Sequence, residues 1–272
     1  MKHHRALWVG GAMVAMVLVV ALFAPLLAPY DPDDPRRAVV LASQLAPPSS
    51  AHPFGNDENG GDVLSRVVYG ARVAVRVGVA TVAISLLIGL ALGCLAGYAG
   101  GAVDGALMRV TEVVMAFPGI LLAIAIVAAT RRPSEAAVIL ALVSTGWASY
   151  ARLARGQVLS LKERDYVTAA KALGASPFFI VRRHIIPNLI QPLVIQASFS
   201  VAGSILAEAS LSFLGLGPEG SHSWGVLLDQ GTQWFVLAPH LAIFPGLAIA
   251  FVVLAFNLLG DGLRDYLDPR LK

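Results

Sequence analysis

The chain has 272 residues, of which 57% are hydrophobic and only 14% are charged. This composition leaves too little polar surface to cover a soluble domain of such length, so it excludes an ordinary water-soluble protein and indicates a membrane protein. The formal net charge of +3 is too small to indicate nucleic-acid binding, and one cysteine, Cys94, excludes a disulfide framework within the chain.

Six apolar segments approach the roughly 20 residues that a helix needs to cross the hydrocarbon core of a bilayer. We expect spans near residues 7–28, 73–98, 107–129, 136–150, 189–214 and 236–259. The fourth is the weakest, because its uncharged part is short and Arg152 must reach toward the headgroups. The first could be taken for a signal peptide, but its long apolar run without a clear cleavage site favours a retained anchor. The sequence thus predicts an all-α membrane protein with six transmembrane helices, divided into an anchor helix with a long loop (1–72) and a five-helix core (73–272).

The basic residues of the loops predict the orientation, because cytoplasmic loops are enriched in Lys and Arg. The segment 152–183, part of a loop at 152–187, holds seven basic and two acidic residues, whereas residues 215–235 hold neither Lys nor Arg. We therefore place the first loop in the cytoplasm and the second outside, with the long N-terminal loop outside and both termini cytoplasmic. Arg131 and Arg132 break this rule in a short outer turn.

A ridge of small residues marks the second span. Gly89, Gly93 and Gly97 repeat every fourth residue. In lipid such a ridge lets another helix approach closely, because apolar surface alone drives no association there. Packing within the subunit is the favoured interpretation, and a contact between subunits is the alternative.

Motifs for catalysis and metal binding are missing from the sequence. There is no G-x-x-x-x-G-K-[ST] phosphate loop, so we expect no ATP hydrolysis by this chain, and neither H-E-x-x-H nor G-x-S-x-G occurs. The six histidines are scattered rather than set at ligand spacing, so no metal site is expected. Residues 215–220 match G-x-G-x-x-G, but they follow a span and open no βαβ unit, so we do not assign them to a nucleotide.

Two carboxylates near apolar segments need an explanation, because a charge in the membrane is costly and often functional. Glu112 follows Arg109 at i+3, which predicts a local ion pair. Glu208 lies deep in the fifth span, in the stretch that ends with Ser212, and no cation is near in sequence. A buried, hydrogen-bonded structural role and a role in lining a polar pathway are both open for this pair.

The cytoplasmic loop contains a segment with helical periodicity, residues 165–174. Tyr166, Ala169, Ala170 and Leu173 fall at i, i+3, i+4 and i+7 and so share one small, apolar face. Gly174 is a suitable C-terminal cap, after which Ser176-Pro177 can open a second helix. A loop this organised, in a chain that is otherwise nearly all membrane, predicts a contact with another protein.

The pattern Ala169-Ala170-x-x-x-Gly174, followed by His184-Ile185-Ile186-Pro187-Asn188, resembles the cytoplasmic EAA loop of ABC importer permeases. Other stretches narrow the resemblance to the C-type permease subunit of the dipeptide, oligopeptide and nickel importer family: residues 52–57 (HPFGND), 61–66 (GDVLSR), 207–217 (AEASLSFLGLG), 255–264 (AFNLLGDGLR) and 268–270 (DPR). The chain departs from the family at Thr168, where the motif has Glu, and at Gly61, where Arg is common.

The resemblance implies the type I ABC importer fold, with a coupling helix that seats in a groove of an ATPase subunit. The coupling residues that the resemblance implies are Thr168, Ala169, Ala170 and Gly174. The helical face adds Tyr166 and Leu173 to this expected contact, and Asp165 can supply a carboxylate near the position of the missing Glu. The implied partners are a second, homologous permease subunit, one or two ABC ATPases that bind ATP and Mg, and an extracytoplasmic substrate-binding protein. The chain itself would carry no cofactor and would lie in a bacterial or archaeal inner membrane.

Three alternatives remain beside a peptide importer. A secondary transporter or channel subunit driven by an ion gradient predicts ionisable residues at the midplane and inverted repeats, and only Glu208 qualifies. A membrane-embedded enzyme lacks any recognisable catalytic constellation. Within the resembling family, a nickel importer predicts a His or Cys cluster in a span, and none is present.

Overall fold

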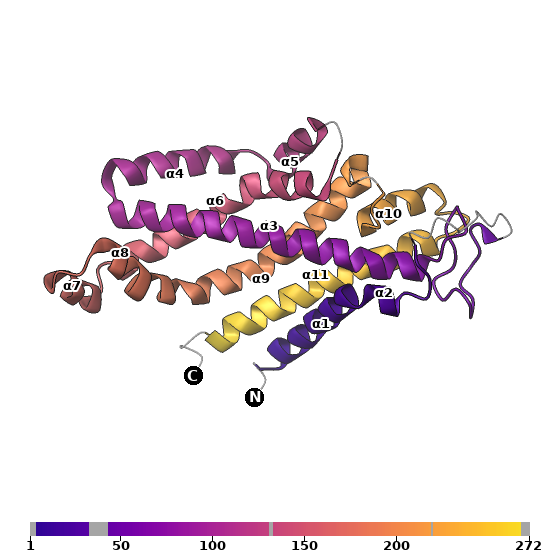
Figure 1. Cartoon of the computed structure of the whole chain (residues 1–272), viewed down its shortest axis with the longest axis horizontal. Coiled ribbons are helices and arrows are strands. Elements are labelled where there is room, and N and C mark those ends of the chain that lie inside the picture. The colour runs from indigo at the N-terminus through magenta and orange to yellow at the C-terminus, as the bar shows by residue number, and fades with distance from the viewer. Residues whose placement is uncertain (1–3, 33–42, 131–132, 219, 268–272) are drawn as a thin grey trace.

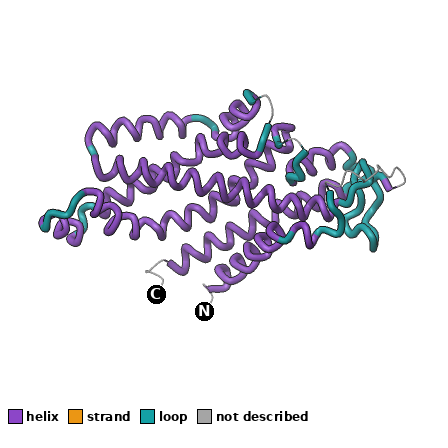
Figure 2. The backbone as a smooth tube through the Cα atoms, in the orientation of Figure 1, coloured by secondary structure: helices purple, strands orange, loops and turns teal. Residues whose placement is uncertain are grey.

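A computed structural model describes residues 4–32, 43–130, 133–218 and 220–267 of the chain. These residues form an elongated helical bundle with its longest described loop at one end (Figure 2). Within the described ranges, five helical segments are long and apolar enough to cross a membrane. They are α1 (His4–Leu22), α3 (Val63–Ala99), α6 (Glu135–Leu161), α9 (Ile186–Leu211) with its flanking turns, and α11 (His240–Leu267). The predicted all-α membrane fold is confirmed.

The third predicted span, at 107–129, is wrong as a single helix. It is divided between α4 (Gly101–Ala116) and α5 (Gly119–Ala128), which meet at 83° and make a sixth span only when counted together. The break lies at Phe117 and Pro118. Phe117 is extended (φ −84°, ψ 138°) because the ring of a following proline disfavours the helical conformation.

The other spans differ from their predicted bounds mainly at the ends. α3 begins at Val63, because Asp62 caps it by accepting a hydrogen bond from the Ser65 amide at 2.8 Å. A short helix, α2 (Ala24–Leu27), follows α1 after a bend at Phe23. The division at residue 72, which lies within α3, stays a prediction. Arg131, Arg132 and residues 268–270 lie outside the described residues.

Successive long helices run in opposite directions between the two ends of the bundle (Figure 1). α1 runs away from α7 (Asp165–Ala172) and α8 (Pro177–Ile180), and α11 runs back toward them (Figure 1). The segment 43–62 and α10 (Trp224–Gln233) lie at the opposite end. α3 packs mainly against α6, while α11 packs against both α1 and α9.

Glycines allow the closest of these helix contacts. A Cβ on Gly93 would lie 2.5 Å from the Ala151 carbonyl oxygen, and one on Gly97 would lie 2.8 Å from Val158 Cβ. Gly89 likewise lies against Tyr150, so the ridge on α3 faces α6 of the same chain. In the same way, Gly10 of α1 lies against the backbone of Leu259 on α11, and Gly262 of α11 lies against Leu7 of α1.

Candidate functional site

The predicted coupling segment, residues 165–180, forms two short helices, α7 and α8, at one end of the bundle (Figure 1). α7 ends in a left-handed turn at Gly174 (φ 82°), as the sequence predicts. The Gly174 amide donates to the Lys171 carbonyl and the Ala175 amide to the Ala170 carbonyl, each at 3.0 Å, which is the Schellman pattern. Ser176 then caps α8 by accepting from the Phe179 amide at 3.3 Å.

One face of α7 is buried and the other is presented to the surroundings. Val167 is fully buried and anchors the helix, although the sequence did not single it out. Tyr166 is 43% exposed and Leu173 is 89% exposed. Of the other predicted coupling residues, Asp165, Thr168, Ala169 and Gly174 are exposed, and Ala170 is partly buried. The predicted set is therefore brought together at the surface.

Two aromatic residues extend this surface beyond the predicted set. Phe178 is 75% exposed and Phe179 is 51% exposed. Large apolar side chains exposed at the end of a membrane bundle, next to a helix with small side chains, offer a surface that another protein can cover. The sequence analysis did not single out these two residues; the available signal is the Phe-Phe pair directly after Ser176-Pro177.

His184 joins the coupling segment to the next long helix. Its ring lies 6.0 Å from the Tyr166 ring and 5.9 Å from the Phe179 ring. It belongs to a π-helical turn, η2 (Val181–Ile185), which leads directly into α9, where the Asn188 side chain donates to the His184 carbonyl at 2.7 Å. α7, α8 and the start of α9 are thus linked by side-chain contacts.

The N-terminal side of this segment also contacts the transmembrane helices. Lys162, just after the end of α6, donates through Nζ to the carbonyl of Gly97 on α3 at 3.2 Å. Lys171 of α7 donates through Nζ to the Lys162 carbonyl at 3.4 Å, so α7 contacts the end of α6 on this side and, through His184, the turn before α9 on the other.

Glu208 lies in a closed hydrogen-bond network rather than next to a cation. It is 1% exposed, and its Oε1 accepts from Ser212 Oγ at 2.7 Å and from Ser223 Oγ at 2.6 Å. Ser212 opens the π-helical turn η3 (Ser212–Leu216), and Ser223 caps α10. The network joins α9 to α10. The structural role for Glu208 and the pathway role remain predictions.

The predicted ion pair between Arg109 and Glu112 is confirmed at 3.2 Å. Both side chains are exposed, at 81% and 58%, so the pair is a local surface contact on α4.

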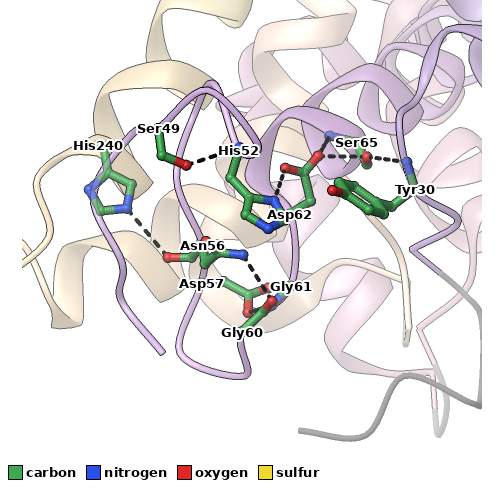
Figure 3. A network of polar contacts seen from close by, with 10 residues as sticks. All are labelled: Tyr30, Ser49, His52, Asn56, Asp57, Gly60, Gly61, Asp62, Ser65 and His240. Carbon is green, nitrogen blue, oxygen red and sulfur yellow. Dashed lines mark hydrogen bonds and ion pairs between the residues drawn. The ribbon is translucent and has the colours of Figure 1, made fainter. Parts of the chain in front are cut away.

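The loop at the opposite end of the bundle is held by polar contacts (Figure 3). Asp62 Oδ1 lies 2.9 Å from His52 Nδ1, and Asp62 Oδ2 accepts from the Ser65 hydroxyl at 2.6 Å. The Tyr30 amide in turn donates to Ser65 Oγ at 3.1 Å. The start of α3 and the end of the N-terminal helical region are thereby joined.

Asp57 is the second centre of this loop. Its Oδ1 accepts from the Gly61 amide at 2.6 Å, and its Oδ2 accepts from Arg66 Nη1 at 2.6 Å. Arg66 also donates to Gln230 of α10 at 2.8 Å. A Cβ on Gly61 would lie 2.6 Å from Asp57 Oδ2, so the glycine that departs from the family pattern allows this close turn.

Metal-binding side chains are not clustered in the described part of the chain. Among those residues, no group of three or more His, Cys, Asp and Glu side chains is placed to hold a metal ion. The polar centres at Asp57, Asp62 and Glu208 are instead engaged by amides, hydroxyls, a guanidinium and an imidazole.

Comparisons with known proteins agree with this architecture. A family model described as "Binding-protein-dependent transport system inner membrane component" matches residues 89–272, and one for the "N-terminal TM domain of oligopeptide transport permease C" matches residues 1–48. A putative peptide transport system permease protein of Brucella abortus is 42% identical over 100% of this chain and 90% of the relative. The glutathione transport system permease protein GsiD of Shigella flexneri is 45% identical over 100% of this chain and 88% of the relative.

Among solved structures, a chain of the MetNI methionine ABC transporter in inward-facing conformations has a similar fold, with a TM-score of 0.54 and 19% identity. The match covers 74% of this chain and 97% of that chain, and it supports the type I importer fold. One family model spans more than half of the sequence, and the named relatives match all of it. The chain therefore belongs to the inner membrane components of binding-protein-dependent transport systems.

Proposed function

We propose that this permease is the transmembrane subunit of an ATP-driven importer of di- or oligopeptides. The observation that carries the proposal is α7, a short helix anchored by the buried Val167 that presents small side chains outward at one end of the bundle. The names of the relatives, a peptide and a glutathione transport permease, support a peptide substrate.

The position and contacts of α7 explain how ATP hydrolysis would be coupled to movement of the transmembrane helices. The exposed Thr168 and Ala169, with the turn at Gly174, permit close docking in a groove of an ABC ATPase. ATP and Mg are bound by that partner, and the permease supplies no cofactor. When the ATPases close, α7 moves and carries the end of α6 with it through the contact of Lys171 with Lys162, and α9 through His184. This rigid-body change opens the pathway to alternate sides of the membrane.

The partners and the orientation follow from the same arrangement. The basic end of the bundle, with α7, the start of α1 and the end of α11, faces the cytoplasm, where the ATPases lie. The segment 43–62, held firmly by Asp57 and Asp62, faces outward as the platform for the substrate-binding protein. A second, homologous permease subunit completes the pathway, so that part of the substrate lining comes from outside this chain.

An ion-gradient mechanism and a nickel substrate have less support. Glu208, the acidic residue that an ion-coupled pathway would use, is engaged by two serine hydroxyls. A nickel site calls for imidazole, thiolate or carboxylate ligands, and the described residues offer no such cluster.

The test is uptake by a purified complex of the permease pair, the ATPases and the binding protein in proteoliposomes. We expect labelled peptide to accumulate with ATP and not with a non-hydrolysable analogue. Ala170→Glu should abolish uptake while the chain still inserts, because a charge would be buried at the ATPase contact without a partner. Uptake driven by an ion gradient without ATP would contradict the proposal.

A further inference from the structure

A cavity of about 260 Å³, with a mostly apolar lining that includes several hydroxyl groups, lies among α3, α5, α6 and α9. Its position near Thr81 and Ser85, about midway along α3, places it within the membrane-spanning part of the bundle. No charged residue lines it. The polar lining consists of hydroxyl side chains: Thr81, Ser85, Thr145, Ser149, Ser200 and Ser204, together with Tyr150.

The hydroxyls of Thr81, Ser85 and Tyr150 lack a partner among the described residues, and those of Thr81 and Ser85 lie one turn apart on α3. Thr81 is 3% exposed and Ser85 is 1% exposed, and neither hydroxyl has a hydrogen-bond partner among the described residues. By contrast, Ser149 Oγ donates to the Gly146 carbonyl of its own helix at 3.0 Å. A buried hydroxyl without a partner is unfavourable, so these two point to a ligand that hydrogen-bonds to them.

The break between α4 and α5 adds a third feature. Gly119 and Ile120, the first two residues of α5, line the same cavity. The first amides of a helix have no acceptor within the helix, and the aligned peptide dipoles give this end a partial positive charge. A negatively charged ligand group is therefore favoured at this end, and the uncharged lining holds no acidic side chain that would repel it.

We propose that this cavity binds the terminal carboxylate of the transported peptide, with the Thr81 and Ser85 hydroxyls donating to it beside the first turn of α5. The inference rests on the proposed function and adds a binding site within this subunit. The cavity is slightly smaller than the roughly 300 Å³ at which ligand pockets begin, so it holds one end of a peptide. The exposed Gly203 lies at its wall with no atom near the position of a Cβ, which leaves room for entry.

The main experiment compares a peptide with a free C-terminus and its C-terminal amide in the reconstituted complex. We expect Thr81→Val combined with Ser85→Ala to reduce uptake of the free peptide about tenfold, as the loss of a charge-assisted hydrogen bond predicts, and to leave uptake of the amide unchanged. Because each peptide is compared with itself in wild type, discrimination by the binding protein cancels. Ser210→Ala, which removes an exposed hydroxyl bonded to its own helix, is the matched control and should change neither rate.

A second measurement removes the binding protein altogether. Millimolar free peptide should raise the melting temperature of the wild-type complex more than the amide does, and the double variant should lose this difference. Without peptide, the variant should melt no lower than wild type, because the removed hydroxyls had no partner.

The results of these experiments distinguish a failure of the carboxylate site from a failure of the proposed importer function. Equal loss of uptake for both peptides, or an unchanged preference for the free peptide in the double variant, would overturn the carboxylate site. A wild-type complex that transports neither peptide would instead contradict the proposed function on which it rests. Gly203→Leu, which fills the wall of the cavity, should slow uptake of both peptides, whereas Gly11→Leu, at an equally open helical position on α1, should not.

Discussion

Arg155 on α6 and Asp104 on α4 form a bidentate ion pair, in which Arg155 Nε donates to Asp104 Oδ1 at 2.5 Å and Nη2 donates to Oδ2 at 2.7 Å. α4 buries little else, since Thr111 is its only fully buried residue among those described. The pair therefore fixes α4 to the part of α6 that leads into the coupling segment.

Breaking this pair should loosen α4. We expect Asp104→Asn or Arg155→Gln to lower the stability of the complex by about 1 kcal/mol, since the side chains are partly exposed and bidentate geometry adds to an ordinary surface pair. The melting temperature of the purified complex measures this loss. Asp104→Arg combined with Arg155→Asp should recover part of it, and a double variant less stable than both single ones would speak against a direct pairing.

Gly174 should be needed for coupling rather than for insertion. A side chain at φ 82° costs about 1–2 kcal/mol of backbone strain, and Leu there would also collide in the ATPase groove. We expect Gly174→Leu to insert normally and to abolish substrate-stimulated ATP hydrolysis by the complex.

Gly156→Leu is the matched control for this position. Gly156 is exposed on α6, with an ordinary helical conformation and no atom near its Cβ position, so the added side chain should leave stimulated hydrolysis intact. Normal stimulation and transport by the Gly174→Leu complex would remove this residue from the coupling contact.

Substitutions of Glu208 distinguish a structural role from a role in the transport pathway. Gln keeps an oxygen that can accept from both Ser212 and Ser223, so Glu208→Gln should retain assembly and transport. Glu208→Ala leaves both hydroxyls buried without this acceptor and should cost about 2 kcal/mol of stability, seen as reduced expression and a lower melting temperature. Altered transport by a normally expressed Glu208→Gln complex would assign the residue to the pathway instead.

Local patterns in the sequence were sufficient for the features that depend on nearby residues. The i, i+3, i+4 and i+7 spacing predicts the face of α7, Gly174 predicts its C-terminal cap, and Ser176-Pro177 predicts the start of α8, because these signals act within one turn. The break at Pro118 also had a local signal, yet a count of apolar residues treated 107–129 as one span because hydropathy carries no direction.

Contacts between residues that are far apart in the sequence cannot be predicted from local patterns. Asp104 and Arg155 are 51 residues apart, and nothing in either local pattern pairs them. The periodicity of α7 did not reveal that Val167 is the residue that becomes fully buried, because burial depends on what α7 packs against. The cavity around Thr81 likewise needs four helices: α3, α6 and α9 each contribute a few hydroxyl residues, α5 contributes its first turn, and no local pattern joins them.

The most direct test of the account is the side of the membrane on which each end of the bundle lies. Ser160→Cys, exposed near the end of α6, should react with an impermeant thiol reagent only after the cells are permeabilised. Ser221→Cys, before α10, should react in intact cells, and native Cys94, 7% exposed within α3, should stay unlabelled. Labelling of position 160 in intact cells would place α7 outside, where no ATPase could reach it, and would contradict the importer mechanism.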